Sequence, residues 1–239
     1  MNRYDVRRLF SVVSAVCVLS SSAFGAEEDQ FARQREQMVK ETIELRGVKD
    51  PVTLKAMRNV PRHEFVDEQL KRMAYADRPL PIGYGQTISQ PYIVAAMTEM
   101  LQVKEGDVVL EIGAGSGYQA AVLAEFVDHV YTIEIVPELA EISTERLKRL
   151  GYDNATVKEG DGYFGWEEHA PFDGIIVTAA ATHIPPPLIE QLKPGARMVI
   201  PVGPPMQVQN LMLVEKQEDG TITQRSVMPV RFVPLTGER

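Results

Sequence analysis

Three glycines at alternate positions, Gly113, Gly115 and Gly117, constrain the fold of this 239-residue chain more than any other feature. They follow the apolar run 108–112 and precede segment 118–126, which reads as a helix. Glycines at a strand-to-helix turn let the backbone approach a ligand closely, and the helix N-terminus then offers free N–H groups. The sequence therefore predicts an α/β fold with a ligand site at this turn.

The segments after the glycines repeat the same alternation of strand and helix. Expected strands lie at 108–112, 130–134, 155–158, 173–177 and 197–202, and expected helices at 118–126, 137–150 and 187–192. This spacing predicts a mostly parallel twisted sheet with helices on both faces. The last two expected strands, 211–214 and 222–230, are joined through the turn Asp219-Gly220, which predicts an antiparallel C-terminal edge.

The region before the sheet is expected to be helical. Asp50 and Pro51 suit the N-cap and first position of a helix, and Gly47 suits the end of the preceding one. Helices are expected at 30–45, 51–59 and 91–101, with a short helical or irregular stretch at 65–75 and an ordered loop at 77–90. The expected organisation is one domain over 26–239, with a helical extension at about 30–105 and the sheet-bearing core at about 106–239.

Residues 1–25 differ in composition from the rest of the chain. A basic start with Arg3, Arg7 and Arg8 is followed by the apolar run 9–19 and then by small residues. That layout is typical of a secretory signal peptide, and the run is too short to span a membrane comfortably. We expect export to the periplasm; an uncleaved amphipathic helix or an incorrectly assigned start codon would be the alternatives.

Charge and cysteine content narrow the expected partners. The chain carries 25 Lys+Arg against 33 Asp+Glu, a net charge of −8, which argues against a nucleic-acid binder. Cys17 is the only cysteine and lies in the apolar run, so the processed chain would have no disulfide, thiol catalyst or cysteine metal site. We expect no stable membrane association after processing. The four histidines are scattered, and no metal site is expected.

The pattern around the glycines indicates which ligand the loop takes. A dinucleotide loop would place a third glycine or alanine at position 118, where this chain has Tyr118. The pattern acidic-x-G-x-G-x-G, beginning at Glu111, instead resembles the first motif of the class I S-adenosylmethionine-dependent methyltransferases. That resemblance implies a Rossmann-like methyltransferase fold in which this loop wraps the methionine end of the cofactor. The alternative is a tight turn that binds nothing.

Two more acidic positions follow successive expected strands. Glu134 ends the second strand, 21 residues after Gly113, where a carboxylate can accept hydrogen bonds from ribose hydroxyls. Asp161, followed by Gly162, comes after the third strand, and the methyltransferase resemblance implies a contact with the adenine amino group there. Each carboxylate alone is more typical of a solvated loop. Three acidic positions in register on successive loops favour a cofactor site.

A wider set of segments resembles one methyltransferase family, the protein-L-isoaspartate O-methyltransferases. The resemblance runs from about Arg33 to Thr236 and is carried by Val60–Val66, Leu80–Pro91, Ala170–Ala180, Leu192–Gly195, Pro201–Gly203 and Arg231–Leu235. It implies a monomeric repair enzyme, usually cytoplasmic, that methylates the α-carboxylate of L-isoaspartyl residues in damaged proteins. The ester then collapses to a succinimide that can reopen as aspartate. The expected export is a departure from this family pattern.

The resemblance assigns the substrate site to two segments. Ser89 takes the active-site role, with Thr87 and Ile88 beside it, while Val233 and Leu235 flank the bound peptide. A carboxylate is already ionised at neutral pH, so catalysis needs a neutral hydroxyl to orient it rather than a general base. The alternatives are that Ser89 caps the helix beginning near Pro91, that Thr87 is a loop hydroxyl, and that 233–235 is an edge strand.

Other functions remain open from the sequence. The stretch Val177–Ala181 lacks the Asn/Asp-Pro-Pro-Tyr signature of enzymes that methylate amide or exocyclic nitrogens, which disfavours those substrates. A small-molecule carboxyl methyltransferase would share the cofactor but not the peptide. A non-catalytic exported peptide-binding protein on the same fold would bind no cofactor.

Overall fold

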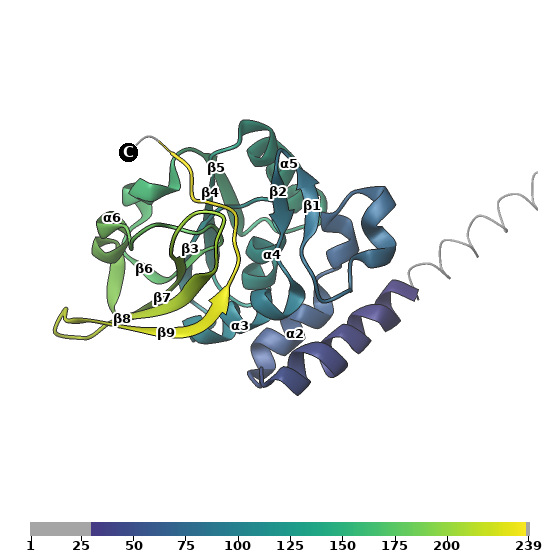
Figure 1. Ribbon diagram of the computed structural model, residues 1–239, viewed down its shortest axis with the longest axis horizontal. Coiled ribbons are helices and arrows are strands. Elements are labelled where there is room, and N and C mark those ends of the chain that lie inside the picture. The colour runs from purple at the N-terminus through teal and green to yellow at the C-terminus, as the bar shows by residue number, and fades with distance from the viewer. Residues whose placement is uncertain (1–29, 238–239) are drawn as a thin grey trace, which may run out of the picture.

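A seven-stranded sheet forms the centre of the protein (Figure 1). The computed structural model describes residues 30–237. The spatial order of the strands is β5-β4-β3-β6-β7-β8-β9. Their bounds are β3 Val108–Ile112, β4 His129–Glu134, β5 Ala155–Glu159, β6 Phe172–Val177, β7 Leu192–Val202, β8 Gln209–Lys216 and β9 Ile222–Val230.

The direction of the strands confirms the predicted mostly parallel sheet. The five strands β5, β4, β3, β6 and β7 are mutually parallel, and β8 and β9 add an antiparallel edge. From β3 the chain moves outward to β4 and β5 and then returns to the other side of β3 with β6. The strand order therefore reverses at β3, and ligands of such sheets bind beyond the carboxyl ends of the strands at this point.

Apolar side chains cover both faces of the sheet, as expected when parallel strands are buried between helices. Val109 and Ile176 belong to one core with the helices α3 (Pro91–Leu101) and α4 (Tyr118–Ala124). Leu110 and Val177 point into a second core that includes Leu188 of α6. The remaining helices of the sheet region are α5 Pro137–Arg149, α6 Pro186–Glu190 and the 3₁₀ turns η5 Gly162–Phe164 and η6 Glu167–His169.

The N-terminal helices pack on the first of these cores. Residues 30–38 are α-helical and continue through a π-helical turn, η1 (Val39–Ile43), and a 3₁₀ turn, η2 (Glu44–Arg46). Gly47, with φ of 101°, ends this helix as predicted. Helix α2 (Pro51–Asn59) has Asp50 as its N-cap, whose carboxylate accepts from the Thr53 N–H at 2.8 Å. Two 3₁₀ segments follow, η3 Arg62–Phe65 and η4 Glu68–Met73.

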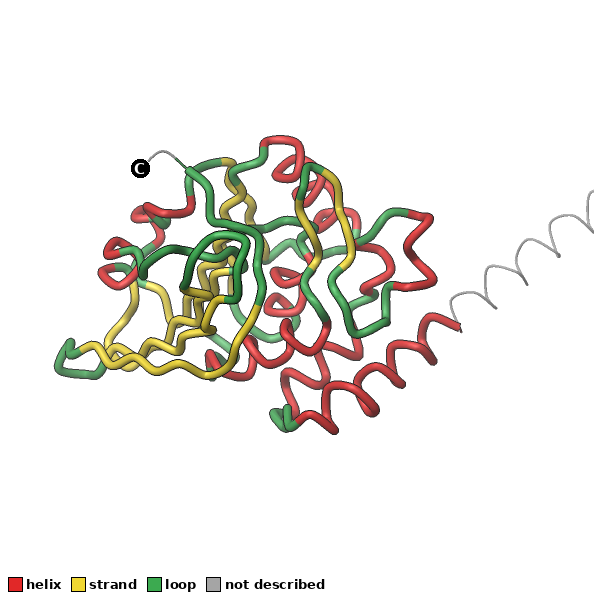
Figure 2. Tube along the Cα trace, in the orientation of Figure 1, coloured by secondary structure: helices red, strands yellow, loops and turns green. Residues whose placement is uncertain are grey.

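The segment expected to be a loop at 77–90 contains a small antiparallel hairpin, so that prediction was wrong. Strands β1 (Leu80–Gly83) and β2 (Gln86–Ile88) pair with each other but not with the main sheet. Their turn places Gly83, Tyr84 and Gly85 at positive φ, which two glycines make accessible. Figure 2 shows the hairpin as a separate pair of strands beside the helices.

The C-terminal segment after β9 turns back toward the carboxyl ends of the strands (Figures 1 and 2). The Ala180 N–H donates to the Val233 carbonyl, and the Leu235 N–H donates to the Ala180 carbonyl, each at 2.8 Å.

The expected signal segment 1–25 and Cys17 lie outside the described residues. Within residues 30–237, no helix has both the length and the apolar character that crossing a membrane requires.

Candidate active site

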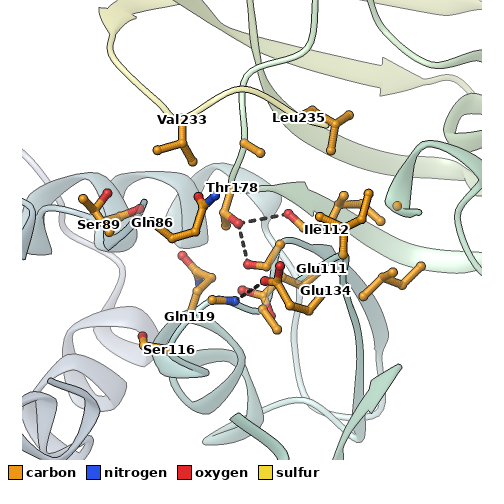
Figure 3. Close-up of a pocket in the computed structure, with 18 of the residues that line it drawn as sticks. Gln86, Ser89, Glu111, Ile112, Ser116, Gln119, Glu134, Thr178, Val233 and Leu235 are labelled. Atoms are coloured by element: carbon orange, nitrogen blue, oxygen red, sulfur yellow. Dashed lines mark hydrogen bonds between the residues drawn. The ribbon is translucent and has the colours of Figure 1, made fainter. Parts of the chain in front are cut away.

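A cleft lies at the carboxyl end of β3, where the strand order reverses (Figure 3). Most of the residues predicted for the site line it: Thr87, Ile88, Ser89, Glu111, Gly113, Gly115, Glu134, Gly162, Val233 and Leu235. They come from β2, β3, β4, the turn after β5 and the C-terminal segment. The fold thus brings together residues that are as far apart in the sequence as Thr87 and Leu235.

Backbone hydrogen bonds hold the glycine loop in place. The N–H groups of Gly113 and Ala114 both donate to the Ile133 carbonyl, at 2.8 and 3.2 Å. The Gly113 φ is +98°, and a Cβ built there would lie 2.5 Å from Oγ1 of Thr178. A side chain at this position would therefore meet both backbone strain and a clash.

Thr178 fixes the other side of the loop. Its hydroxyl lies within hydrogen-bond distance of the carbonyls of Ile112, at 2.9 Å, and of Gly113, at 2.7 Å (Figure 3). Thr178 was not among the site residues predicted from the sequence. The available signal was its place directly after strand 173–177, at the same edge of the sheet as the other loops.

Glu134 is held by two backbone donors. Its Oε2 accepts from the Gly115 N–H at 2.7 Å and its Oε1 from the Val136 N–H at 3.0 Å. The side chain is buried and lines the cleft. Each carboxylate oxygen can accept a further hydrogen bond, so the position still suits the predicted role toward ribose hydroxyls.

Glu111 is the most unusual group in the cleft. It is fully buried in the middle of the sheet, and neither carboxylate oxygen has a hydrogen-bond partner among residues 30–237. Burial raises the pKa of Glu111 to about 8; the nearby Thr132 hydroxyl opposes this rise, and the negative charge of Glu134 adds to it. Two neighbouring carboxylates, one of them unpartnered, suit a ligand that carries positive charge.

Two predicted cofactor residues do not line the cleft. Gly117 has a φ of +86° and packs against Leu147 and Ser143, so it serves the turn into α4. Asp161 accepts from the Tyr163 N–H at 2.9 Å through Oδ1, and Gly237 lies against its other oxygen, Oδ2. The contact of Asp161 with adenine stays a prediction.

Ser89 lies opposite the two carboxylates in the cleft (Figure 3). The N-cap of α3 is Gln90, with no side-chain capping bond, so the alternative that Ser89 caps this helix was wrong. The Ser89 side chain is half-buried, and its carbonyl accepts from Arg62 at 2.6 Å.

A second pocket opens next to the cleft. The two cavities share four side chains, Thr87, Ser89, Thr178 and Val233. The rest of the second pocket has an apolar wall formed mainly by Ile93, Val208, Met228, Val230 and Phe232, and its charged lining residues are Arg46 and Arg231. Arg46 is paired with Asp77 at 2.7 Å, so Arg231 is the residue whose charge suits the second pocket to an anionic ligand with apolar neighbours.

Among residues 30–237, no cluster of three or more His, Cys, Asp or Glu side chains could hold a metal ion. The site fits a cationic nucleoside cofactor instead. Glu111 has carboxylate oxygens without a partner, Glu134 can accept hydrogen bonds from ribose hydroxyls, and the absence of a side chain at Gly113 lets a ligand approach the backbone closely. The reversed sheet order and this loop define a class I methyltransferase that uses S-adenosylmethionine. The model of the protein-L-isoaspartate(D-aspartate) O-methyltransferase (PCMT) family matches residues 33–239, and the chain belongs to that family.

Proteins with the family name match this chain over nearly their whole length. Protein-L-isoaspartate O-methyltransferase 2 of Syntrophobacter fumaroxidans is 58% identical over an alignment of 237 residues, and the match covers 95% of this chain and 96% of that protein. Protein-L-isoaspartate O-methyltransferase 1 of Cupriavidus necator is 55% identical over 236 residues, 95% of this chain and 91% of that protein.

Two solved structures share the fold. One, called protein-L-isoaspartate O-methyltransferase, has a TM-score of 0.78 and 30% identity and covers 85% of this chain and 66% of its own. The other is a Plasmodium falciparum protein described as a beta-aspartate methyltransferase (PCMT), in complex with S-adenosyl-L-homocysteine. Its TM-score is 0.73 at 27% identity, and the match covers 84% of this chain and 98% of that one.

Proposed function

We propose that this protein transfers a methyl group from S-adenosylmethionine to the α-carboxylate of L-isoaspartyl residues in damaged proteins and peptides. The observation that carries this proposal is the junction of two cavities at Thr87, Ser89, Thr178 and Val233. One cavity has the buried carboxylates and glycine loop of a cofactor site, and the other has cations and apolar walls. Two reactants that meet at one such junction gain most of their rate from proximity and orientation.

The cofactor side is assigned to the residues around β3 and β4. Glu111 faces the methionine end with its unpartnered carboxylate, and Glu134 accepts from the ribose hydroxyls. Gly113, Gly115 and Gly162 have no side chains that would fill the cleft. At Gly162 a side chain would also clash with the strand, because its Cβ would lie 2.3 Å from Cγ2 of Ile112. When bound, S-adenosylmethionine supplies a methyl group activated by a sulfonium.

The substrate side is assigned to the hairpin and the C-terminal segment. Ser89 donates a hydrogen bond that orients the isoaspartyl carboxylate without neutralising its charge. Thr87 and Ile88 form the adjoining wall, while Val233 and Leu235 flank the peptide. Arg231 gives the second pocket a positive charge that favours an anionic substrate, whereas the charge of Arg46 is paired with Asp77.

The test is methyl transfer from labelled S-adenosylmethionine to two matched peptides that differ only in L-isoaspartate against L-aspartate. We expect strong labelling of the isoaspartyl peptide and background labelling of the other. Equal labelling of both peptides would overturn the repair function. Folded protein that binds S-adenosylhomocysteine but labels neither peptide would instead be a small-molecule methyltransferase. Folded protein that does not bind S-adenosylhomocysteine and labels neither peptide would be a non-catalytic peptide-binding relative.

We also propose that residues 1–25 direct export and that the processed protein is a soluble monomer. The three-part composition of this segment supports export, and the periplasm would then have to receive S-adenosylmethionine from the cytoplasm. Mass spectrometry of the N-terminus from separated cell fractions tests the first point. A periplasmic form that begins near Ala26 supports it, whereas an intact N-terminus in the cytoplasm overturns it. Light scattering of the processed form tests the second, because a dimer mass would contradict it.

A further inference from the structure

Arg62 is a completely buried cation in the segment Val60–Val66, which the proposed function has not used. Its Nε donates to the Ala74 carbonyl at 2.7 Å, and its Nη2 donates to the Ser89 carbonyl at 2.6 Å. These two carbonyls stand at the ends of the segment that contains the hairpin β1–β2. One planar side chain therefore binds both ends of residues 74–89, the segment that carries Thr87, Ile88 and Ser89.

The same guanidinium also contacts the start of the helix that follows the glycine loop. Its central carbon lies 4.7 Å from the ring centroid of Tyr118, which begins α4 directly after the glycine loop and lines the cleft. The guanidinium contacts two carbonyls and one aromatic ring, and its Nη1 has no hydrogen-bond partner among the described residues. Arg62 thus lies between the Ser89 segment and the start of α4.

Stability alone does not explain a cation in this place. Burial lowers the pKa of the Arg62 guanidinium, which reflects the cost of removing its charge from water. An apolar side chain of similar volume is often at least as stabilising as a buried ion. The rigid planar fork of an arginine, in contrast, holds two acceptors in one fixed geometry, whereas an apolar chain donates to neither and the rotatable donors of a lysine fix that geometry less well.

We propose that Arg62 is a positioning residue for methyl transfer, which holds the Ser89 backbone so that the Ser89 hydroxyl faces the junction of the two cavities. This inference rests on the proposed role of Ser89. Arg62 acts through the Ser89 carbonyl, and its contact with Tyr118 orients the guanidinium for that bond.

A double-mutant cycle with Ser89 tests the inference. We compare wild type, Arg62→Lys, Ser89→Ala and the double variant for kcat and KM with an isoaspartyl peptide. Arg62→Lys should lower kcat/KM by about 10-fold or more in the wild-type background and by less than about twofold in the Ser89→Ala background. The affinity for S-adenosylhomocysteine should change by less than about threefold in all four proteins.

Arg58→Met provides the matched control. Arg58 is half-buried in the neighbouring helix α2 and pairs with Glu36 and Glu44, but it contacts neither Ser89 nor the cleft. Its loss should lower the melting temperature while leaving the kcat and KM of the folded protein unchanged. Arg62→Met replaces Arg62→Lys in the cycle if the lysine variant does not fold.

Three results would overturn the inference. The first is an Arg62 effect that persists in full without the Ser89 hydroxyl, and the second is an Arg62→Lys variant with wild-type kinetics. The third is failure of both Arg62 variants to fold, which would make Arg62 a structural residue. A Ser89→Ala variant with normal kinetics would remove the proposed role of Ser89 as well, and a wild type inactive on isoaspartyl peptides would overturn the proposed function itself.

Discussion

The cofactor half of the site, residues 111–117 with Glu134 and Gly162, is built differently from the substrate half, residues 86–89 with 231–235. In the cofactor half, backbone hydrogen bonds hold the glycine loop and Glu134 at the edge of the sheet. In the substrate half, two segments from distant parts of the sequence meet over the sheet, and Thr87 and Arg231 remain exposed. The first half is set by the topology of the sheet, while the second is assembled from additions to it.

This difference has a consequence for function. Substitutions in the cofactor half should weaken the binding of both cofactor and peptide, because the substrate half packs directly against it. Changes in the substrate half should act on the peptide and leave cofactor affinity nearly unaltered.

The largest effect is expected from Gly113→Ala, which combines positive φ with a clash against Thr178. We expect the affinity for S-adenosylhomocysteine to fall by about 100-fold or more, measured by calorimetry. Gly106→Ala is the matched control, since Gly106 has a φ of +88° with no atom within 4 Å. That variant should lose about 1–2 kcal/mol of stability and keep its cofactor affinity. Wild-type affinity in Gly113→Ala would contradict the proposed loop role.

Ser89→Ala should produce the opposite pattern. Loss of a hydrogen bond to a charged group costs about 1.5–3 kcal/mol, so kcat/KM for the isoaspartyl peptide should fall by about 10- to 100-fold. The affinity for S-adenosylhomocysteine should stay within about twofold, because the hydroxyl faces the substrate side. Ser226→Ala, on the exposed strand β9, is the control and should leave both quantities unchanged. A loss of cofactor affinity in Ser89→Ala would break the division between the halves.

Glu111→Gln sharpens the comparison through pH. Burial raises the pKa of Glu111 from its ordinary value of 4.5 to about 8, so folding favours its protonated form. The stability this provides is fully present below pH 4.5 and is lost as pH rises toward 8. The free protein should therefore lose melting temperature over this range, and Glu111→Gln should reduce that loss and be the more stable form at pH 8. The exposed Glu159→Gln should melt like wild type at each pH; a similar gain there would rule out Glu111 as the cause.

Val233→Ala should have the smallest effect. The Val233 carbonyl bond to Ala180 does not depend on the side chain, so the segment should keep its course. Removing two methyl groups from the peptide side loses about 1 kcal/mol of apolar contact, which predicts a rise in KM of about fivefold with kcat nearly constant. Val52→Ala, on the surface of α2, should leave KM unchanged. A changed kcat with an unchanged KM would contradict this role for Val233.

The same division explains what the sequence could predict. The main strands and the positions of Glu111, Gly113 and Glu134 follow from hydrophobic pattern and loop chemistry, because they depend on residues close in sequence. The hairpin β1–β2 did not, since its strands are only 4 and 3 residues long and two prolines with two glycines obscure their pattern.

The remaining differences depend on contacts that a single sequence does not contain. The position of Gly237 against Asp161 brings together residues 76 positions apart. The bond from Arg62 to the Ser89 carbonyl involves a backbone acceptor, which leaves no signal in residue type. Thr178 differs from these, because its place directly after the expected strand 173–177 is a signal that the sequence does contain.

The most direct test of the two-part site is a crystal structure with S-adenosylhomocysteine and an L-isoaspartyl peptide bound together. We predict that the ribose hydroxyls contact Glu134 and that the isoaspartyl carboxylate lies within hydrogen-bonding distance of the Ser89 hydroxyl, at the junction shared with Thr178 and Val233. A peptide carboxylate bound away from Ser89, or a cofactor bound outside the glycine loop, would contradict the account.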